Sequence, residues 1–134
     1  MKVIVCGGRD FKGWKTAKTA LDFWLPRLPI TAVIQGGQVS LDPAERHLPW
    51  EQRKKWGADY IAKRWAELRG IPVIEEAVSA EEWKKLGGAA GPIRNRKMLD
   101  LHKPQAVISF EGGSGTADML RQARARGIKC IEVS

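Results

Sequence analysis

The chain has 134 residues, which is enough for one well-buried core and too few for two domains of ordinary size. Lysine and arginine number 23 against 15 acidic residues, and the net charge of +8 favours anionic partners such as nucleotides, nucleic acid or acidic lipid. No apolar run approaches a transmembrane length, and the first residues, MKVIVCGG, lack the apolar core of a signal peptide. We therefore expect a single cytoplasmic domain over residues 1–134, with no membrane partner.

Short β-branched runs alternate along the chain with segments of helical periodicity. The runs predict strands at 2–6, 31–35, 72–75, 106–110 and 128–133. The segments between them predict helices at 14–25, 56–69, 93–102 and 116–126. Continuous apolar strands separated by helices are typical of a parallel sheet covered on both faces. The sequence therefore predicts an α/β fold, Rossmann-like and doubly wound, with a mainly parallel sheet of about five strands flanked by helices.

Two segments interrupt this alternation. The stretch at about 38–55 has two prolines, mixed charge and no clear period, and it predicts a long loop or lid inserted between a strand and its helix. Residues 79–91 join a capped helical turn, SAEEWKKL, to the sequence GGAAG. Both segments lie beside the expected ligand loops, so each is either a gate over a ligand site or a plain surface insertion.

Glycines cluster where three of the predicted strands end. These glycines are Gly7 and Gly8, then Gly36 and Gly37, then Gly112, Gly113 and Gly115. The last cluster, in FEGGSGTADML, precedes a helix expected to begin at Thr116. Free glycine amides and a helix start favour a phosphate group, and the hydroxyls of Ser114 and Thr116 add donors. The alternative is a tight turn in which Thr116 only caps the helix.

Arginines accompany two of these loops. In CGGRDF, Arg9 either binds a phosphate or carboxylate through two hydrogen bonds, or Arg9 and Asp10 simply pair with each other or cap the following segment. In GPIRNRKML, Arg94, Asn95 and Arg96 fall around the first turn of an expected helix. There they either bind an anion or form a solvated basic face.

Acidic and aromatic residues supply further candidates. Asp59, near the start of a predicted helix, either accepts a hydrogen bond from a ribose hydroxyl or only makes a favourable contact with the helix dipole. Trp50 and Trp56, in and after the insertion, either stack on a base or form a subunit contact. The other four of the six tryptophans lie in helix-like segments, where burial explains them: Trp14, Trp24, Trp65 and Trp83.

The cysteines and histidines point to no metal site and no cofactor. Cys6 and Cys130 lie in apolar strand-like runs without partners at metal spacing, so we expect buried thiols rather than a disulfide or a zinc site. His47 and His102 have no suitably spaced acid, histidine or cysteine, so neither is assigned a catalytic role.

Taken together, these residues resemble the YspA, cpYpsA-related branch of the SLOG superfamily, whose relatives include the LOG phosphoribohydrolases and the Rossmann-like domain of DprA. The resemblance runs from VIVCGGRDF through a GG loop, GAD, GIPV, AAGPIRNRKML and GGSGTADM to the last strand. It implies a pocket for nucleotides or nucleotide-derived ligands. The pocket residues that it implies are Gly7, Gly8, Arg9, Gly36, Gly37, Arg94, Asn95, Arg96, Gly112, Gly113, Ser114, Gly115 and Thr116.

The chain departs from the family pattern in two places. The second GG loop is usually followed closely by an arginine and GAD, whereas about 19 residues separate the two here. The role of that arginine then passes to Arg53, Lys54 or Lys55, or it is lost. The phosphoribohydrolases resemble GGxGTxxE, and Met119 stands here at the position of that glutamate. Asp118 is its neighbour, about 100° round the helix.

The sequence favours a module that senses or sequesters a nucleotide or nucleotide-derived phosphorylated ligand. One alternative is an N-glycosidic hydrolase of nucleoside monophosphates, with Asp118, Asp59 or Glu111 as the catalytic carboxylate. Another is DprA-like nucleic-acid binding along a basic track. That track consists of Lys84, Lys85, Arg94, Arg96, Lys97 and Lys103. Small folds of this type often associate through helices, so we expect a homo-oligomer, with a dimer favoured.

Overall fold

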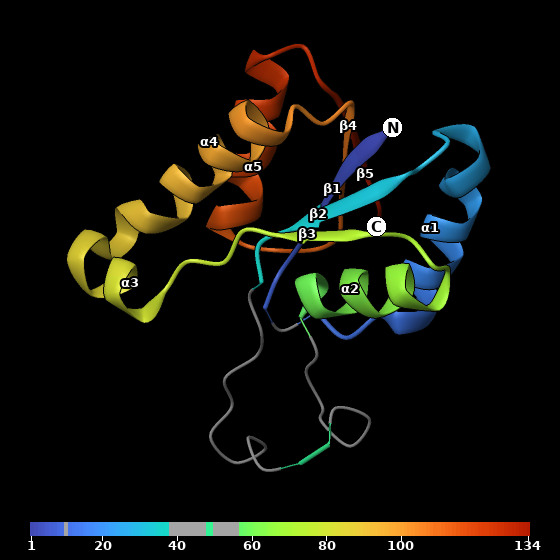
Figure 1. The fold of residues 1–134 in the computed structure, drawn as a ribbon, viewed down its shortest axis with the longest axis horizontal. Coiled ribbons are helices and arrows are strands. Elements are labelled where there is room, and N and C mark those ends of the chain that lie inside the picture. The colour runs from blue at the N-terminus through green and yellow to red at the C-terminus, as the bar shows by residue number, and fades with distance from the viewer. Residues whose placement is uncertain (10, 38–47, 50–56) are drawn as a thin grey trace.

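The computed structural model describes residues 1–9, 11–37, 48–49 and 57–134. Among these residues, five strands form one sheet in the order β3-β2-β1-β4-β5, and every neighbouring pair is parallel (Figure 1). The strands are β1 (Lys2–Cys6), β2 (Ala32–Gln35), β3 (Val73–Glu75), β4 (Ala106–Ser109) and β5 (Lys129–Glu132). The prediction of a Rossmann-like, doubly wound α/β fold is confirmed.

Helices cover both faces of this sheet (Figure 1). One face carries α1 (Trp14–Arg27) and α2 (Ala58–Leu68), and the other carries α4 (Ala90–His102) and α5 (Ser114–Ala125). The short helix α3 (Ala80–Leu86) and the 3₁₀ turn η2 (Gly87–Ala89) pack against the start of α4. Within the described part of the chain, none of the helices has both the length and the apolar character needed to cross a membrane.

The helix that contains GPIRN begins earlier than the sequence predicts. α4 begins at Ala90 rather than at Ile93, because η2 runs directly into it. Pro92 is then the third residue of α4, where a backbone N–H would have no intrahelical acceptor, so proline is tolerated. The capped turn expected within 79–91 is confirmed. Ser79 Oγ accepts from the Glu82 N–H at 3.0 Å, and Glu82 Oε1 accepts from the Ser79 N–H at 3.3 Å.

Each strand contributes to two hydrophobic cores, because successive side chains point to opposite faces of a sheet. Val3 of β1 packs with Leu21 of α1 and Trp65 of α2, all of them fully buried. Its neighbour Ile4 packs on the other face with Met119 of α5. Burial on both faces explains why the strands read as continuous apolar runs rather than as alternating ones.

The strand order determines where loops are free to form a site. The chain proceeds from β1 to β2 on one side, whereas β4 lies on the other side of β1. In such sheets, ligands bind outside the carboxyl ends of the strands at the point where the order reverses, which here lies between β1 and β4. The predicted insertion at about 38–55, with His47, Trp50 and the basic residues 53–55, lies outside the described residues except for positions 48 and 49. Asp10 and Trp56 also lie outside them.

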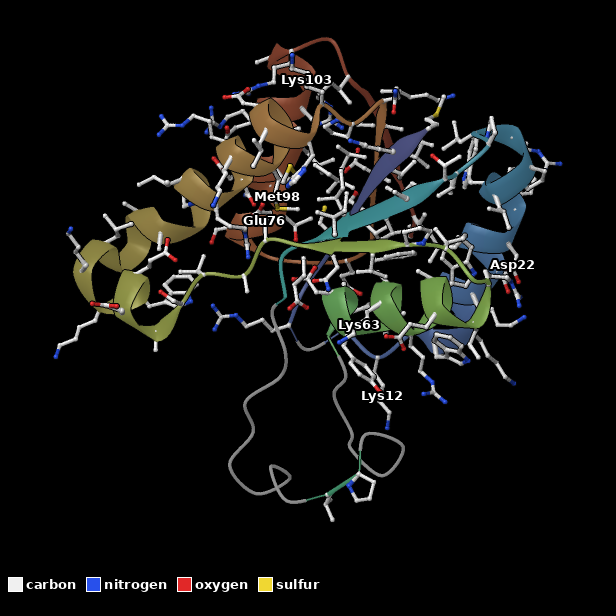
Figure 2. All side chains as sticks on the ribbon, viewed as in Figure 1. Lys12, Asp22, Lys63, Glu76, Met98 and Lys103 are labelled. Carbon is white, nitrogen blue, oxygen red and sulfur yellow. The ribbon has the colours of Figure 1, made fainter. Side chains whose placement is uncertain are left out.

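A buried tryptophan and a carboxylate link α1 to α2. Asp22 Oδ1 accepts hydrogen bonds from Trp65 Nε1 and Arg69 Nε, each at 2.9 Å, and Asp22 Oδ2 accepts from Arg69 Nη2 at 2.8 Å (Figure 2). Lys18 adds a longer contact of 3.2 Å. These hydrogen bonds, foremost the one from Arg69, hold the pKa of Asp22 below its usual range. Trp65 is fully buried, so its indole N–H depends on this acceptor.

Asp22→Ala is therefore expected to lower the free energy of unfolding by about 1–3 kcal/mol at neutral pH, because the buried indole N–H of Trp65 loses its acceptor. Urea unfolding measures this loss. Lys18→Ala, which removes only an exposed i,i+4 pair, should leave the urea midpoint nearly unchanged and serves as the control.

The loss should depend on pH in one direction. Because folding lowers the pKa of Asp22, its contribution is fully present above the unfolded carboxyl pKa of about 3.9. It is lost as the pH falls below that value through the folded pKa. The difference between the wild type and Asp22→Ala should therefore shrink in acid, and a difference that grew in acid would contradict this account.

Candidate functional site

A hollow of about 500 Å³ lies where β1, β2 and β4 end, beside the starts of α2, α4 and α5. This volume falls within the range of roughly 300–1,000 Å³ that is typical of small-molecule sites. We call it the strand-end pocket. Most of the predicted ligand-binding residues line it. They are Gly7, Gly8, Arg9, Gly36, Asp59, Arg94, Asn95, Gly113, Ser114, Gly115 and Thr116.

Gly112 does not line the pocket, but it allows the β1 and β4 loops to meet. A methyl group at Gly112 would overlap Thr116 Oγ1 and would lie 2.8 Å from the backbone nitrogen of Gly8. That same N–H of Gly8 donates to the carbonyl of Glu111 at 2.8 Å. Only glycine fits at this approach, so Gly112 holds one wall of the pocket in place.

Gly37 and Arg96 also lie outside the pocket lining. Gly37 has a φ of +68°, a left-handed conformation that favours glycine, and its N–H donates to Gln35 Oε1. Arg96 is exposed on α4 and lines a different hollow, which it shares with Arg121 and Arg126 of the α5 side. The sequence places both residues beside the site, whereas the structure gives Gly37 a role in turning the chain and directs Arg96 away from the pocket.

The start of α5 opens into the strand-end pocket. α5 begins at Ser114, two residues before the predicted start, and its N-cap Gly113 provides no capping side chain. The first N–H groups of a helix have no intrahelical acceptor, and here they belong to Ser114, Gly115 and Thr116, which all line the pocket. The alternative in which Thr116 caps the helix is wrong, because Thr116 is the third helical residue. Free N–H groups and the positive end of the helix dipole together favour an anion at this point.

Two guanidinium groups face the pocket from different elements. Arg9 follows β1, and Arg94 lies in the second turn of α4, where its Nη1 donates to the carbonyl of Gly36 at 2.9 Å. Burial lowers the pKa of Arg94, the charge of Asp59 opposes that effect, and the positive charge of Arg9 adds to it. Arginine nonetheless stays charged at neutral pH. The pocket therefore holds two cations that an anion between them would stabilise.

Asp59 is the only acid among the described residues that line the pocket. It is the second residue of α2 and is 7% exposed, and the preceding Ala58 N–H donates to the carbonyl of Gly8 at 3.0 Å. A methyl group at Gly36 would lie 3.1 Å from Asp59 Oδ2 and would overlap the guanidinium of Arg94. Asp59 and Arg94 thus flank Gly36, and the pocket keeps an excess of positive charge.

Asn95 and Asp118 join α4 to α5. Asn95 Nδ2 donates to the carbonyl of Gly115 and to Asp118 Oδ2, both at 3.1 Å, and Gln122 Nε2 donates to the same carboxylate oxygen at 2.8 Å. Arg121 pairs with the other oxygen. Burial raises the pKa of Asp118, but these hydrogen bonds outweigh it and leave the pKa below its ordinary value. The carboxylate of Asp118 is therefore engaged in holding two helices together.

The other acids weighed as catalytic groups lie outside the pocket lining. Met119 lines the pocket on α5 and is 1% exposed, whereas its neighbour Asp118 does not line it. Glu111 is exposed after β4 and lines a separate hollow on the α1 side, near Phe11. Of the three candidate carboxylates, only Asp59 reaches the pocket.

Several lining residues were not predicted as part of the site. They are Cys6, Trp83, Gly88, Gly91, Pro92, Met98 and Met119. Trp83 is the most informative, because the sequence analysis assigned it to burial. It is half-buried, and the guanidinium carbon of Arg9 lies 5.6 Å from its ring centroid. α3 has only seven residues and buries none of them, so the indole lies at the pocket rather than in a core, and no local pattern in the sequence indicates this.

The thiol of Cys6 lies in the pocket wall, and burial together with the nearby charge of Asp59 raises its pKa. The pKa of Cys130 is also raised by burial, and both cysteines are free. A raised pKa disfavours the thiolate, which is the nucleophilic form of cysteine. No group of histidine, cysteine, aspartate and glutamate suited to a metal ion occurs among the residues that the structure describes.

Gly112→Ala tests whether the contact between the two loops builds the pocket. The added methyl group overlaps Thr116, so we expect a loss of about 1–3 kcal/mol in the free energy of unfolding, measured by urea denaturation. Gly113→Ala is the matched control, because nothing lies within 4 Å of a methyl group placed there. Equal urea midpoints for the two variants would show that the loops adjust freely.

No protein-family model, curated protein or solved structure matches this chain. The function proposed below is therefore based on the geometry of the strand-end pocket and on the sequence motifs of the chain.

Proposed function

We propose that the strand-end pocket binds a nucleotide or nucleotide-derived phosphorylated ligand, and that the protein acts as a sensor or sequestering module for it. The observation that carries the proposal is the uncapped start of α5, which opens into a pocket that also holds Arg9 and Arg94. Backbone N–H groups at a helix start and guanidinium groups are both strong phosphate donors. They approach the pocket from three segments that are distant in sequence.

The remaining lining suits the other parts of a nucleotide. In this arrangement a phosphate lies at the start of α5, and a sugar hydroxyl donates to the carboxylate of Asp59. Met98 and Met119 supply apolar surface, and Figure 2 shows Met98 on the side of α4 that faces the sheet. A mostly apolar hollow with a few polar groups is the usual composition of a small-molecule site. The resemblance to the SLOG superfamily supports the same class of ligand.

The proposal favours binding over turnover because of what occupies the wall of α5. The thioether of Met119 cannot transfer a proton or stabilise a developing positive charge as a carboxylate does. The carboxylate of Asp118 already accepts hydrogen bonds from side chains of α4 and α5. A sensor needs neither group, whereas an N-glycosidic hydrolase needs an acid placed at the bond that breaks.

Gly115→Asp tests the anion site without disturbing the fold. Nothing lies within 4 Å of a Cβ at this position, and an acid in the first turn of a helix interacts favourably with its dipole. We expect unchanged or slightly higher stability, together with a loss of about 10- to 100-fold in affinity for nucleoside monophosphates, since each tenfold is about 1.4 kcal/mol. Isothermal titration calorimetry on the wild type and the variant measures this loss.

Gly115→Asn is the matched control, because it has nearly the same shape and no charge. It should retain most of the wild-type affinity. If Gly115→Asp and Gly115→Asn bound nucleotides equally well, the phosphate would not lie at the start of α5 and the proposal would be overturned.

The position of Asp59 favours a second candidate, an N-glycosidic hydrolase, because this buried acid does line the pocket. Under the sensor proposal, incubated nucleoside monophosphates stay intact, as checked by chromatography of the mixture. Release of free base by the wild type, abolished in Asp59→Asn, would establish the hydrolase instead. Asp118→Asn is the comparison variant, since it alters a carboxylate that does not line the pocket.

A further inference from the structure

Trp83 is the one residue of α3 in the described pocket lining. α3 contains no fully buried residue, and its start is held by the capping box of Ser79 and Glu82. Among the described residues, Trp83 belongs to neither of the two hydrophobic cores that hold the sheet and helices together. Core packing therefore does not account for an indole at this position.

The present partner of the indole is a cation that also belongs to the pocket. The guanidinium of Arg9 lies 5.6 Å from the ring centroid of Trp83, within the range of a cation–π contact. Arg9 is exposed, so this contact is one of the weaker kind. The same guanidinium is close enough to Arg94 for its charge to disfavour that of Arg94. An anion arriving between the two arginines therefore competes directly with the indole for Arg9.

We propose that Trp83 is the stacking platform for the base of the ligand, and that Arg9 leaves the indole for the ligand's phosphate as the base takes its place. The inference rests on the proposed function and adds what distinguishes a nucleotide from a plain sugar phosphate. Aromatic rings pair well with the flat face of any base, because every base has a π-face. Trp83 therefore selects an aromatic heterocycle without choosing strongly among the four common bases.

The exchange also explains how one arginine serves two states of the pocket. Without ligand, the indole keeps the guanidinium of Arg9 beside the pocket. With ligand, a phosphate offers Arg9 stronger, charge-assisted hydrogen bonds than the ring can provide. The base then covers the surface of Trp83 that the guanidinium leaves, so apolar surface does not become exposed to water.

Calorimetric titration of the wild type and Trp83→Leu with the four nucleoside 5′-monophosphates and with ribose 5-phosphate tests the platform. The wild type should bind the tightest nucleotide roughly 10- to 100-fold more tightly than ribose 5-phosphate, the range that base–aromatic stacking provides. Trp83→Leu should lose this advantage while its affinity for ribose 5-phosphate does not fall, because the indole no longer competes for Arg9. A variant that keeps the advantage, or that loses affinity for both probes equally, would overturn the inference and leave the proposed function intact. A wild type that binds neither probe would overturn both.

Tryptophan fluorescence supplies a second readout with conservative variants. A saturating nucleoside monophosphate should quench the emission of the wild type and of Trp24→Phe. Trp24 is half-buried on α1 and packs against the core on the other face of the sheet. Trp83→Phe should bind the nucleotide with most of the wild-type affinity and show little quenching. Quenching that persists in Trp83→Phe at saturation would show that the base stacks elsewhere.

Discussion

The contact between the backbones of the β1 and β4 loops determines where the rest of the pocket lies. Gly8 and Gly112 approach so closely that no methyl group fits between them and Thr116. Because the loops touch, α5 starts directly beside the end of β1, and its first N–H groups face the same space as Arg9. The carbonyl of Gly8 also accepts from the first residue of α2, so one turn of backbone positions two helix starts. These contacts form the pocket at the place between β1 and β4 where the strand order reverses.

α4 joins the two sides of that pocket through adjacent residues. Arg94 donates to the carbonyl of Gly36 after β2, and Asn95 donates to the carbonyl of Gly115 in α5. Arg94 and Asn95 thus both connect the loops around the pocket and line it. The contacts that shape the site therefore also stabilise the fold. This coupling is why the glycines with open space, at positions 113 and 115, are better probes of binding than Arg94, whose removal would also loosen a wall.

The fold could be predicted from the sequence because burial on both faces makes the central strands β1, β2 and β4 mostly apolar runs, and glycine or proline marks the ends of the strands. The site could be predicted in outline, since strand ends of a parallel sheet meet at one edge and glycines mark close backbone approach. What failed was the direction of single side chains. Whether Asp118 or Met119 faces the pocket depends on the rotation of α5 against α4, and the role of Trp83 depends on where a short helix docks. Both are set by long-range packing that no local pattern encodes.

The side chains near the pocket that could take part in chemistry have other contacts. Burial raises the pKa of the Cys6 thiol, hydrogen bonds from two helices engage Asp118, and Met119 lines the adjacent wall. Amide N–H groups and guanidiniums, by contrast, stabilise charge that the ligand already carries before any reaction. Such groups lower a dissociation constant when they bind a charge that stays the same, and they lower a barrier only where they contact charge that develops in the transition state. Under the proposed function the pocket holds a phosphorylated ligand without changing it, and Asp59, the one acid among the described lining residues, is the residue on which that distinction turns.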